Sequence, residues 1–169
     1  MLLEIACFTY GDALIAIEGG ASRIELCAGR SKGGLTPLKN AGVELCALSP
    51  VPIFIMIRPP GKDFIYNEER IVEMKKLIRF YKTQKCAGFV FGALDEKRKV
   101  NKRQCKQLVK LAHPLPCTFH RAFDLTPNLE EAMEDIIECG FKRILTSGGP
   151  GNAHENLETL KALFKKAGK

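Results

Sequence analysis

The sequence predicts an α/β protein built around one parallel β-sheet. Short apolar segments of strand length alternate with longer segments whose apolar residues recur at helical spacing. Serial strand–helix units place their strands in parallel, with right-handed crossovers. One segment, PIFIMI at 52–57, contains no polar residue, which is typical of a parallel strand covered on both faces. The pattern alone leaves open a doubly wound sheet or a (β/α)8 barrel, which needs about eight units and about 250 residues.

Six strand–helix units follow one another, and no linker separates them. The expected strands are Leu2–Cys7, Arg23–Cys27, Pro52–Ile57, Gly88–Gly92, Cys117–His120 and Arg143–Thr146. The expected helices are Tyr10–Gly19, Ala41–Leu48, Asn67–Tyr81, Asn101–Ala112, Asn128–Cys139 and Asn152–Lys166. The start of the second strand and that of the sixth both read Gly-x-x-Arg-Ile, a weak internal echo. We therefore expect a single domain, 1–169, with about six βα units, fewer than a complete barrel contains.

Composition and charge exclude several classes of protein. The 169 residues are 46% hydrophobic and 27% charged, as in an ordinary globular domain. No apolar run reaches the roughly 18 residues that span a bilayer, and the N-terminal segment lacks the basic start of a secretory signal, so we expect a cytoplasmic protein, with the nucleus open. The net charge of +7 is scattered over separate segments. We therefore expect no membrane partner and no nucleic-acid partner.

Seven cysteines occur at wide spacing with no CxxC pair, so a disulfide framework or a zinc site is not expected. Most of them fit small buried core positions. Cys7 and Cys27 end neighbouring strands, and soft thiolates select Cu(I). This leaves two interpretations of the pair, ligands of a Cu(I) ion or core residues.

Titratable side chains gather where the predicted strands end. His120 ends the fifth strand and Arg121 and Asp124 follow it, while Glu25 and Arg58 lie at the ends of the second and third. Because the carboxyl ends of parallel strands meet at one edge, we expect one site there, with His120, Glu25 and Asp124 as catalytic residues and both arginines binding an anion. Two structural alternatives remain, a neutral His120 bonded to a backbone carbonyl and a buried Glu25–Arg58 ion pair.

The end of the sixth strand adds a possible anion cradle. Thr146, Ser147 and Gly148 precede the last helix, where backbone amides can bind an anion. No Gly-x-Gly-x-x-Gly follows the first strand, so we expect no nucleotide cofactor.

Several motifs resemble those of the copper homeostasis protein CutC family. They are Arg23–Cys27 (RIELC), Gly33–Pro37 (GGLTP), Met56–Pro59 (MIRP) with Asp63 and Phe64, Phe91–Leu94 (FGAL), Thr118–Asp124 (TFHRAFD) and Leu145–Gly148 (LTSG). The motifs run in the family's order over almost the whole chain. The resemblance implies a TIM-barrel-like fold, which favours the barrel over the doubly wound sheet. It also implies a cytoplasmic protein linked to copper handling, for which no catalytic activity is established.

The chain departs from the family pattern in three ways. Ala6 stands where some members carry a cysteine, which places Cys7 one position later in the strand. Pro60 and Lys62 replace an arginine and a glycine of the family loop, and Lys62 is a partial substitute for the lost anion ligand. The six units also lack two further strands of the family, so we expect an incomplete barrel that forms homo-oligomers through its open edge. Three functions follow as hypotheses. The first is copper handling by Cys27 and Cys7, and the second is an enzyme or binder that takes a small anionic ligand at the polar cluster. The third is a non-catalytic fragment or interaction protein that keeps the motifs.

Overall fold

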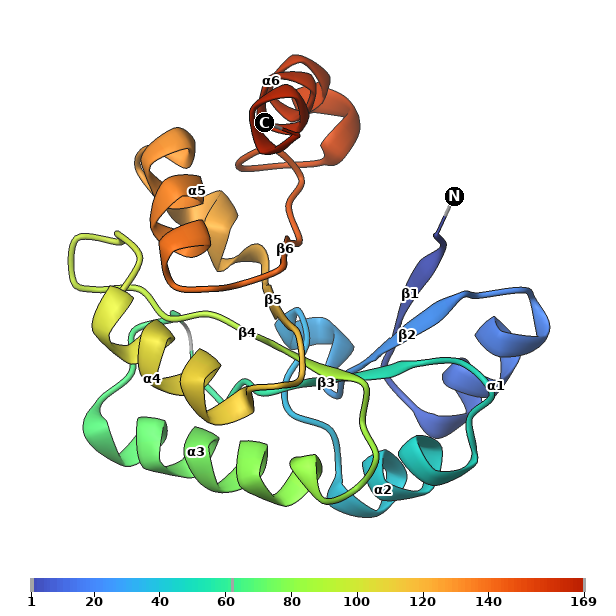
Figure 1. Cartoon of the computed structure of the whole chain (residues 1–169). Helices are drawn as coiled ribbons and strands as arrows, with labels where there is room; N and C mark the ends of the chain where they lie inside the picture. Colours follow the sequence, from blue (N-terminus) through green and yellow to red (C-terminus); the bar gives the residue numbers. More distant parts are fainter. Residues whose placement is uncertain (1, 62, 169) are drawn as a thin grey trace.

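A computed structural model describes residues 2–61 and 63–168 of the chain. Its six strands form one parallel sheet in the order β1-β2-β3-β4-β5-β6, and the sheet curls like part of a barrel wall (Figure 1). The strands are β1 (Glu4–Cys7), β2 (Arg23–Leu26), β3 (Ile53–Met56), β4 (Gly88–Phe91), β5 (Cys117–Phe119) and β6 (Arg143–Ile144). Each lies within the corresponding expected strand.

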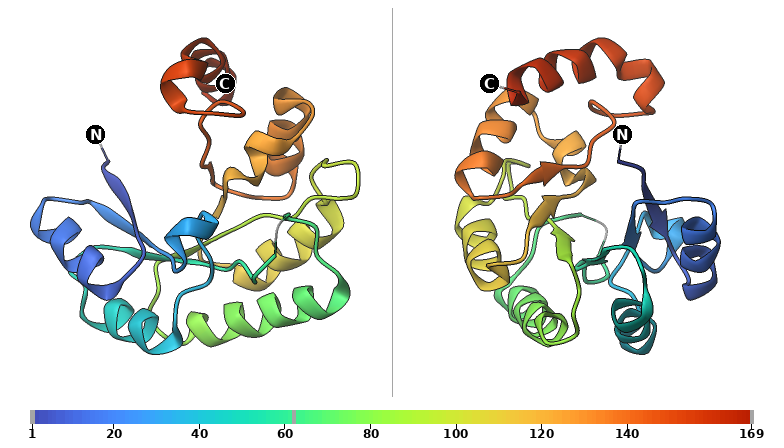
Figure 2. Two further views of the ribbon diagram at one scale, coloured as in Figure 1. Left: turned by 180° about the vertical axis from the view of Figure 1, so that it is seen from behind. Right: turned by 45° about the vertical axis from the view of Figure 1, so that its right-hand side comes forward.

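The helices cover the outer, convex side of the sheet (Figure 2). They are α1 (Tyr10–Glu18), α2 (Lys39–Leu48), α3 (Glu68–Lys82), α4 (Lys102–Ala112), α5 (Leu129–Glu138) and α6 (Leu157–Ala167). A doubly wound sheet would carry helices on both faces, so the one-sided arrangement confirms the TIM-barrel-like interpretation.

Strand residues alternate between two hydrophobic layers. The layer between sheet and helices is the main core, and it includes Ile24, Ile55, Phe89 and Phe119. The concave inner face carries a smaller cluster, Cys27, Phe54, Met56 and Val90, with Phe8 and Ala87 against it. Glu25 and Thr118 alternate with main-core residues along β2 and β5, so these polar side chains lie on the inner face.

Phe54 organises the amino-terminal end of the inner face. The guanidinium carbons of Arg23 and Arg143 lie 4.8 and 4.5 Å from the centre of its ring. These two arginines occupy the same place in the Gly-x-x-Arg-Ile echo. A Cβ on Gly88 would lie 2.1 Å from the Phe54 ring, so only glycine leaves the ring its space.

The largest departures from the expected elements lie in the last third of the chain. A 3-10 helix, η2 (Arg121–Leu125), follows β5 where a loop was expected, and α6 begins only after a second 3-10 helix, η3 (Ala153–Asn156). The predicted strand over 143–146 is shortened to two residues. Thr146 and Ser147 leave the strand direction because they hydrogen-bond with Asp124 in η2.

Among the described residues β1 pairs only with β2 and β6 only with β5, so both edges of the curled sheet are open. Between α5, β6 and α6 lies an apolar groove of about 470 Å³, lined among others by Ile136, Phe141 and Leu163. The Phe164 side chain at its margin is 83% exposed, and Leu2 beside β1 is 57% exposed. No helix in the described part of the chain combines the length and the apolar character needed to cross a membrane.

We expect the 169-residue chain to self-associate through this open side. Unpaired strand edges and exposed apolar surface, worth roughly 25 cal/mol per Å² when buried, both favour association. Sedimentation velocity at about 1 to about 50 µM, where complexes of micromolar affinity form, should show a concentration-dependent dimer or larger species. A monomer over the whole range would contradict this expectation.

Candidate functional site

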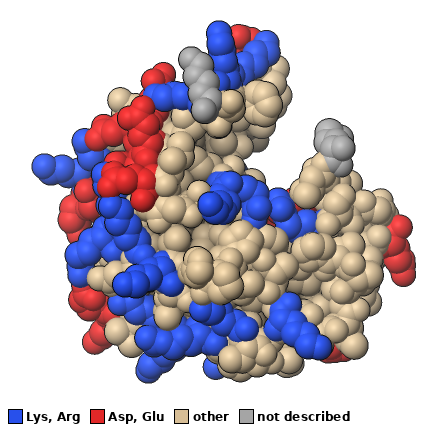
Figure 3. All heavy atoms as spheres, in the orientation of Figure 1, with Lys and Arg blue, Asp and Glu red and all other residues tan. Residues whose placement is uncertain are grey.

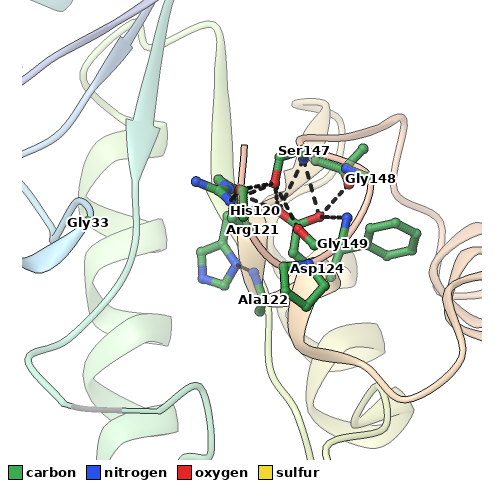
Figure 4. Close-up of polar contacts among 12 residues, drawn as sticks. Gly33, His120, Arg121, Ala122, Asp124, Ser147, Gly148 and Gly149 are labelled. Carbon is green, nitrogen blue, oxygen red and sulfur yellow. Dashed lines mark hydrogen bonds and ion pairs between the residues drawn. The ribbon is translucent and has the colours of Figure 1, made fainter. Parts of the chain in front are cut away.

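The predicted site residues form two adjoining groups at the carboxyl end of the sheet. The interior group contains Glu25, Cys27, Arg58, Tyr66 and His120. Glu25 lies in β2, Cys27 and His120 directly follow β2 and β5, and Arg58 and Tyr66 lie in the loop after β3. The Asp124 group contains Arg121, Asp124, Thr146, Ser147 and Gly149. His120 and Arg121 are consecutive residues and join the two groups (Figure 4). The strand ends therefore bring the expected residues to one end of the sheet, where these residues form two adjoining clusters.

The guanidinium group of Arg58 is held by the loop that follows β2. Its Nη1 donates to the carbonyl oxygens of Lys32, Gly33 and Gly34 at 3.0, 3.2 and 2.9 Å. The two glycines have φ angles of +70° and +92°, which a residue with a side chain adopts only with strain. The face of the guanidinium packs on Phe64, with Cζ 4.4 Å from the ring centre. No ion pair joins Arg58 to Glu25 within the described residues, so the ion-pair alternative is wrong.

Glu25 is a buried carboxyl group whose main neighbour is a thiol. Cys27 Sγ donates to Oε1 at 3.4 Å, while Oε2 has no hydrogen-bond partner in the part of the chain described. Burial raises the pKa of Glu25 to about 7, and the nearby Glu4 carboxylate acts in the same direction. A large fraction of Glu25 is therefore protonated near neutral pH, when its carboxyl group can donate a hydrogen bond.

His120 lies buried between two aromatic rings. Its ring centre is 4.6 Å from that of Phe64 and 5.8 Å from that of Phe119. Burial lowers its pKa to about 3, and the charge of Arg58 contributes, so the imidazole is neutral at pH 7. Its Nδ1 accepts a hydrogen bond from the Ala122 amide at 3.4 Å, which places the remaining proton on Nε2. The alternative of a neutral His120 therefore gives the charge of the imidazole correctly, but the hydrogen-bond partner is a backbone amide instead of the expected carbonyl.

Asp124 is a fully engaged carboxylate (Figure 4). It accepts hydrogen bonds from Arg121 Nε at 2.8 Å, from the amide and hydroxyl of Ser147, from the Thr146 hydroxyl and from the Gly149 amide. Burial acts to raise its pKa, but the hydrogen bonds from Thr146, Arg121 and Ser147 outweigh burial and hold the pKa below its usual value. With its oxygens occupied, Asp124 positions its neighbours, and its catalytic role stays a prediction.

The expected anion cradle already holds an anion of the protein itself. The amides of Ser147 and Gly149 point at the Asp124 carboxylate, and the Gly148 amide donates to the Thr146 hydroxyl. These groups are therefore not available to a ligand. Arg121 differs, because its side chain is 54% exposed while Asp124 and Ser147 fix its orientation.

Cys7 and Cys27 lie on opposite faces of the sheet. Cys7 pairs in register with Leu26 and packs in the core under the helices, whereas Cys27 belongs to the inner cluster. Burial strongly raises the pKa of the Cys27 thiol, and the Glu25 carboxyl adds to this effect. Among the residues that the structure describes, no group of three or more His, Cys, Asp or Glu could hold a metal ion. This arrangement does not fit a Cu(I) ion shared by Cys7 and Cys27, which corrects their expected pairing.

Two aromatic residues of the site were not predicted as ligands. Phe64 separates Arg58 from His120, and the Tyr66 hydroxyl lies beside the Arg58 guanidinium, whose charge opposes the rise that burial causes in the tyrosine pKa. The sequence feature that could have indicated them is the aromatic pair Phe64 and Tyr66, in the loop that follows Arg58. Lys62, the expected substitute anion ligand, lies outside the described residues.

A family model described as the CutC family matches residues 1–169. The chain belongs to the CutC family. It is 42% identical over 166 residues to a human protein named copper homeostasis protein cutC homolog, covering 98% of this chain and 61% of that protein. It is 40% identical over 163 residues to a CutC family protein of Photorhabdus laumondii, covering 96% of this chain and 66% of the relative. This CutC-family chain thus spans less than two thirds of the length of these relatives.

Solved structures agree with this family membership. The crystal structure of a CutC protein of Streptococcus agalactiae, titled a copper homeostasis protein, superposes with a TM-score of 0.93 at 28% identity, covering all of this chain and 84% of the other. A dihydropteroate synthase of Coxiella burnetii gives a TM-score of 0.53 at 15% identity, covering all of this chain and 68% of the other, which reflects the fold alone. The CutC family therefore accounts for both the curled parallel sheet and the motifs at its carboxyl end.

We expect Asp124→Asn to lower the free energy of unfolding by about 3 kcal/mol, because the amide would direct hydrogen atoms at the donors of Ser147 and Gly149. Wild-type stability should also fall as the pH drops below the unfolded-state value of about 3.9 and through the lower folded pKa, a loss that the variant should not show. Urea unfolding from about pH 2.5 to about pH 7, a range that includes the unfolded-state pKa, measures the stability of the variant and the pH dependence of the wild type. The exposed Glu158→Gln is the control, and an equal loss in both variants would contradict the role of Asp124.

Glu25 should impose the opposite pH dependence. Its folded pKa of about 7 lies above the unfolded value, so its favourable contribution is complete below the unfolded pKa and is lost as the pH rises through 7. We expect the free energy of unfolding of the wild type to decrease by about 3 kcal/mol between the unfolded-state pKa and the folded pKa of about 7, because Glu25 loses its proton there. Glu25→Gln should remove this decrease. Unfolding curves of both proteins measure it. Parallel pH profiles for wild type and variant would refute the assignment.

Proposed function

We propose that the carboxyl end of the sheet binds a small anionic metabolite, a carboxylate or a phosphate ester. One observation carries the proposal. Four side chains of the interior group each keep a buried polar atom with no hydrogen-bond partner among the described residues: Glu25 Oε2, Arg58 Nε, Tyr66 Oη and His120 Nε2. Buried polar atoms in native proteins are nearly always satisfied, so their concentration here supports a ligand that completes them.

The chemistry of these four groups supports an anion in particular. Arg58 Nε and the Tyr66 hydroxyl are donors, and His120 Nε2 carries the proton because Nδ1 is an acceptor. Glu25 becomes a fourth donor when protonated, which its pKa of about 7 permits near neutral pH. A ligand rich in acceptor oxygens matches such a set, and the exposed Arg121 adds positive charge at the entrance.

The same donors supply a way to polarise a bound ligand. A neutral imidazole donating from Nε2 stabilises charge that develops on a ligand oxygen, and the protonated Glu25 carboxyl can deliver a proton. His120 then acts as a hydrogen-bond donor instead of a general base, because its pKa of about 3 makes it a weak proton acceptor. Proton transfer at a bound carboxylate or phosphate ester is the reaction class that this set favours.

Copper handling is the second candidate function, because the human and streptococcal relatives are named or titled copper homeostasis proteins. All seven cysteines are free thiols, which suits the reducing cytoplasm where we place the protein. Cys27 alone supplies a soft donor in the interior group, so this function would need sulfur ligands elsewhere in the chain.

Tyr66→Phe tests the anion site with little structural disturbance. Among the described residues the hydroxyl lies beside the Arg58 guanidinium and has no other polar partner, so its removal should change stability little, while loss of a hydrogen bond to a charged ligand should weaken binding about tenfold. Inorganic phosphate and malonate are the probes, titrated calorimetrically into the full chain at low ionic strength. Tyr81→Phe is the matched control, since that buried tyrosine also has an unpartnered hydroxyl but packs against Gly42 in α2. Absence of saturable binding of both probes, or equal affinities in the two variants, would refute the proposal.

A further inference from the structure

We propose that the inner face of the sheet carries a second anion site, in which Arg143 and Arg23 hold a small monocarboxylate. The two arginines are the first residues of β6 and β2, so they lie at the amino-terminal end of the sheet, opposite the interior group. The second site shares no residue with the interior group or with the Asp124 group. The proposal is therefore independent of the proposed function.

The Phe54 ring gathers both guanidinium groups around one point. Their Cζ atoms lie 4.8 Å (Arg23) and 4.5 Å (Arg143) from the ring centre. An aromatic ring attracts the positive charge of a guanidinium, but the N–H donors of that group still need acceptors. The edge of the ring carries partial positive charge, so the ring supplies no acceptor there and favours an anion beside it. Phe54 thus fixes the two arginines without satisfying their donors.

Arg143 has a buried donor that nothing satisfies. Its Nε donates to the hydroxyl of the buried Thr118 at 3.1 Å, which orients the guanidinium. Its Nη2 is shielded from solvent and has no hydrogen-bond partner in the described part of the chain. A buried donor on a charged group costs folding free energy unless an acceptor completes it. The orphaned Nη2 is the observation that points to a ligand.

Glu4 is the carboxylate of this cluster, and it is already engaged. It forms an ion pair with Arg23 Nε, and the two residues are in register between β1 and β2. Burial lowers the pKa of Arg143, and the like charge of Arg23 adds to this effect while Glu4 opposes it. Two cations therefore share one carboxylate. A ligand with a single negative charge restores the balance, and the two oxygens of a carboxylate match the planar fork of a guanidinium.

Solvent reaches the cluster from the open side of the sheet. The side chains of Arg23 and Glu4 are 12% and 20% exposed. Figure 3 shows basic side chains at the floor of the hollow between α6 and β1. The apolar side chains of Phe54, Met56 and Val90 occupy the adjoining inner face, which favours a ligand of few atoms.

Acetate is the probe, titrated calorimetrically into the full chain in a chloride-free buffer of low ionic strength. We expect Arg143→Gln to weaken acetate binding about tenfold, because a hydrogen bond between charged groups is lost. Arg143→Lys keeps the charge but loses the planar fork, so it should also bind acetate more weakly than the wild type. Arg79→Gln is the matched control, since it removes the same charge from an exposed arginine of α3. Absence of saturable binding to the wild type, or equal affinities in Arg143→Gln and Arg79→Gln, would overturn the proposal.

Tyr66→Phe separates the two anion sites. This variant should bind acetate as the wild type does, because Tyr66 belongs to the interior group at the other end of the sheet. Loss of acetate binding in Tyr66→Phe with full binding in Arg143→Gln would assign acetate to the interior group and refute the second site. Failure of phosphate and malonate to bind would affect only the interior group.

A crystal structure of the wild type soaked in acetate covers the case in which the Arg143 variants do not fold. We expect planar density for a carboxylate at about 2.7–2.9 Å from Arg143 Nη2, the usual length of a charged N–H···O hydrogen bond. A water molecule alone at Nη2, or a side-chain carboxylate from a second copy of the chain in that place, would contradict the assignment to a free carboxylate.

Discussion

The hydrogen bonds around the Asp124 carboxylate hold the segment that follows β6 against η2. β6 has only two residues and pairs with β5 alone, so strand pairing is a weak attachment for everything that follows it. Asp124 compensates because one buried carboxylate binds η2 to the loop after β6 through Thr146, Ser147 and Gly149. Charged hydrogen bonds of this kind are about twice as strong as neutral ones. The same carboxylate orients Arg121, so the attachment of β6 and the entrance of the site depend on one group.

The electrostatic character of the interior group follows from burial more than from ion pairing. His120 is neutral at pH 7 because burial lowers its pKa to about 3, and Glu25 is partly protonated there because burial raises its pKa to about 7. Arg58 stays charged and is solvated by three backbone carbonyls in place of water or a carboxylate. The result is an inner surface with one fixed positive charge and neutral donors, which is a suitable environment for an anion and an unsuitable one for a cation.

The fold could be predicted largely from local patterns. Each of the six strands lies inside its expected range, because uninterrupted apolar runs such as PIFIMI have few alternatives. The sidedness of the helices could not be derived from periodicity and came from the family resemblance. At the site, chain order correctly brought Glu25, Arg58 and His120 to one end. The order of the elements could not show that the Asp124 carboxylate would accept hydrogen bonds from the Ser147 and Gly149 amides. That contact requires a 3-10 helix and a loop from separate units to meet.

The alternation along β5 also limits how this gene can evolve. Cys117 and Phe119 face the helices while Thr118 and His120 face inward, so insertion or deletion of one residue would exchange the two sets. Cys117 and Phe119 would then enter the concave side, and an imidazole and a hydroxyl would enter the main core. Changes of two residues preserve the parity of the strand but shift the register with β4 and β6. Natural variation in chain length among homologous sequences should therefore concentrate in the connecting loops and remain absent from this strand.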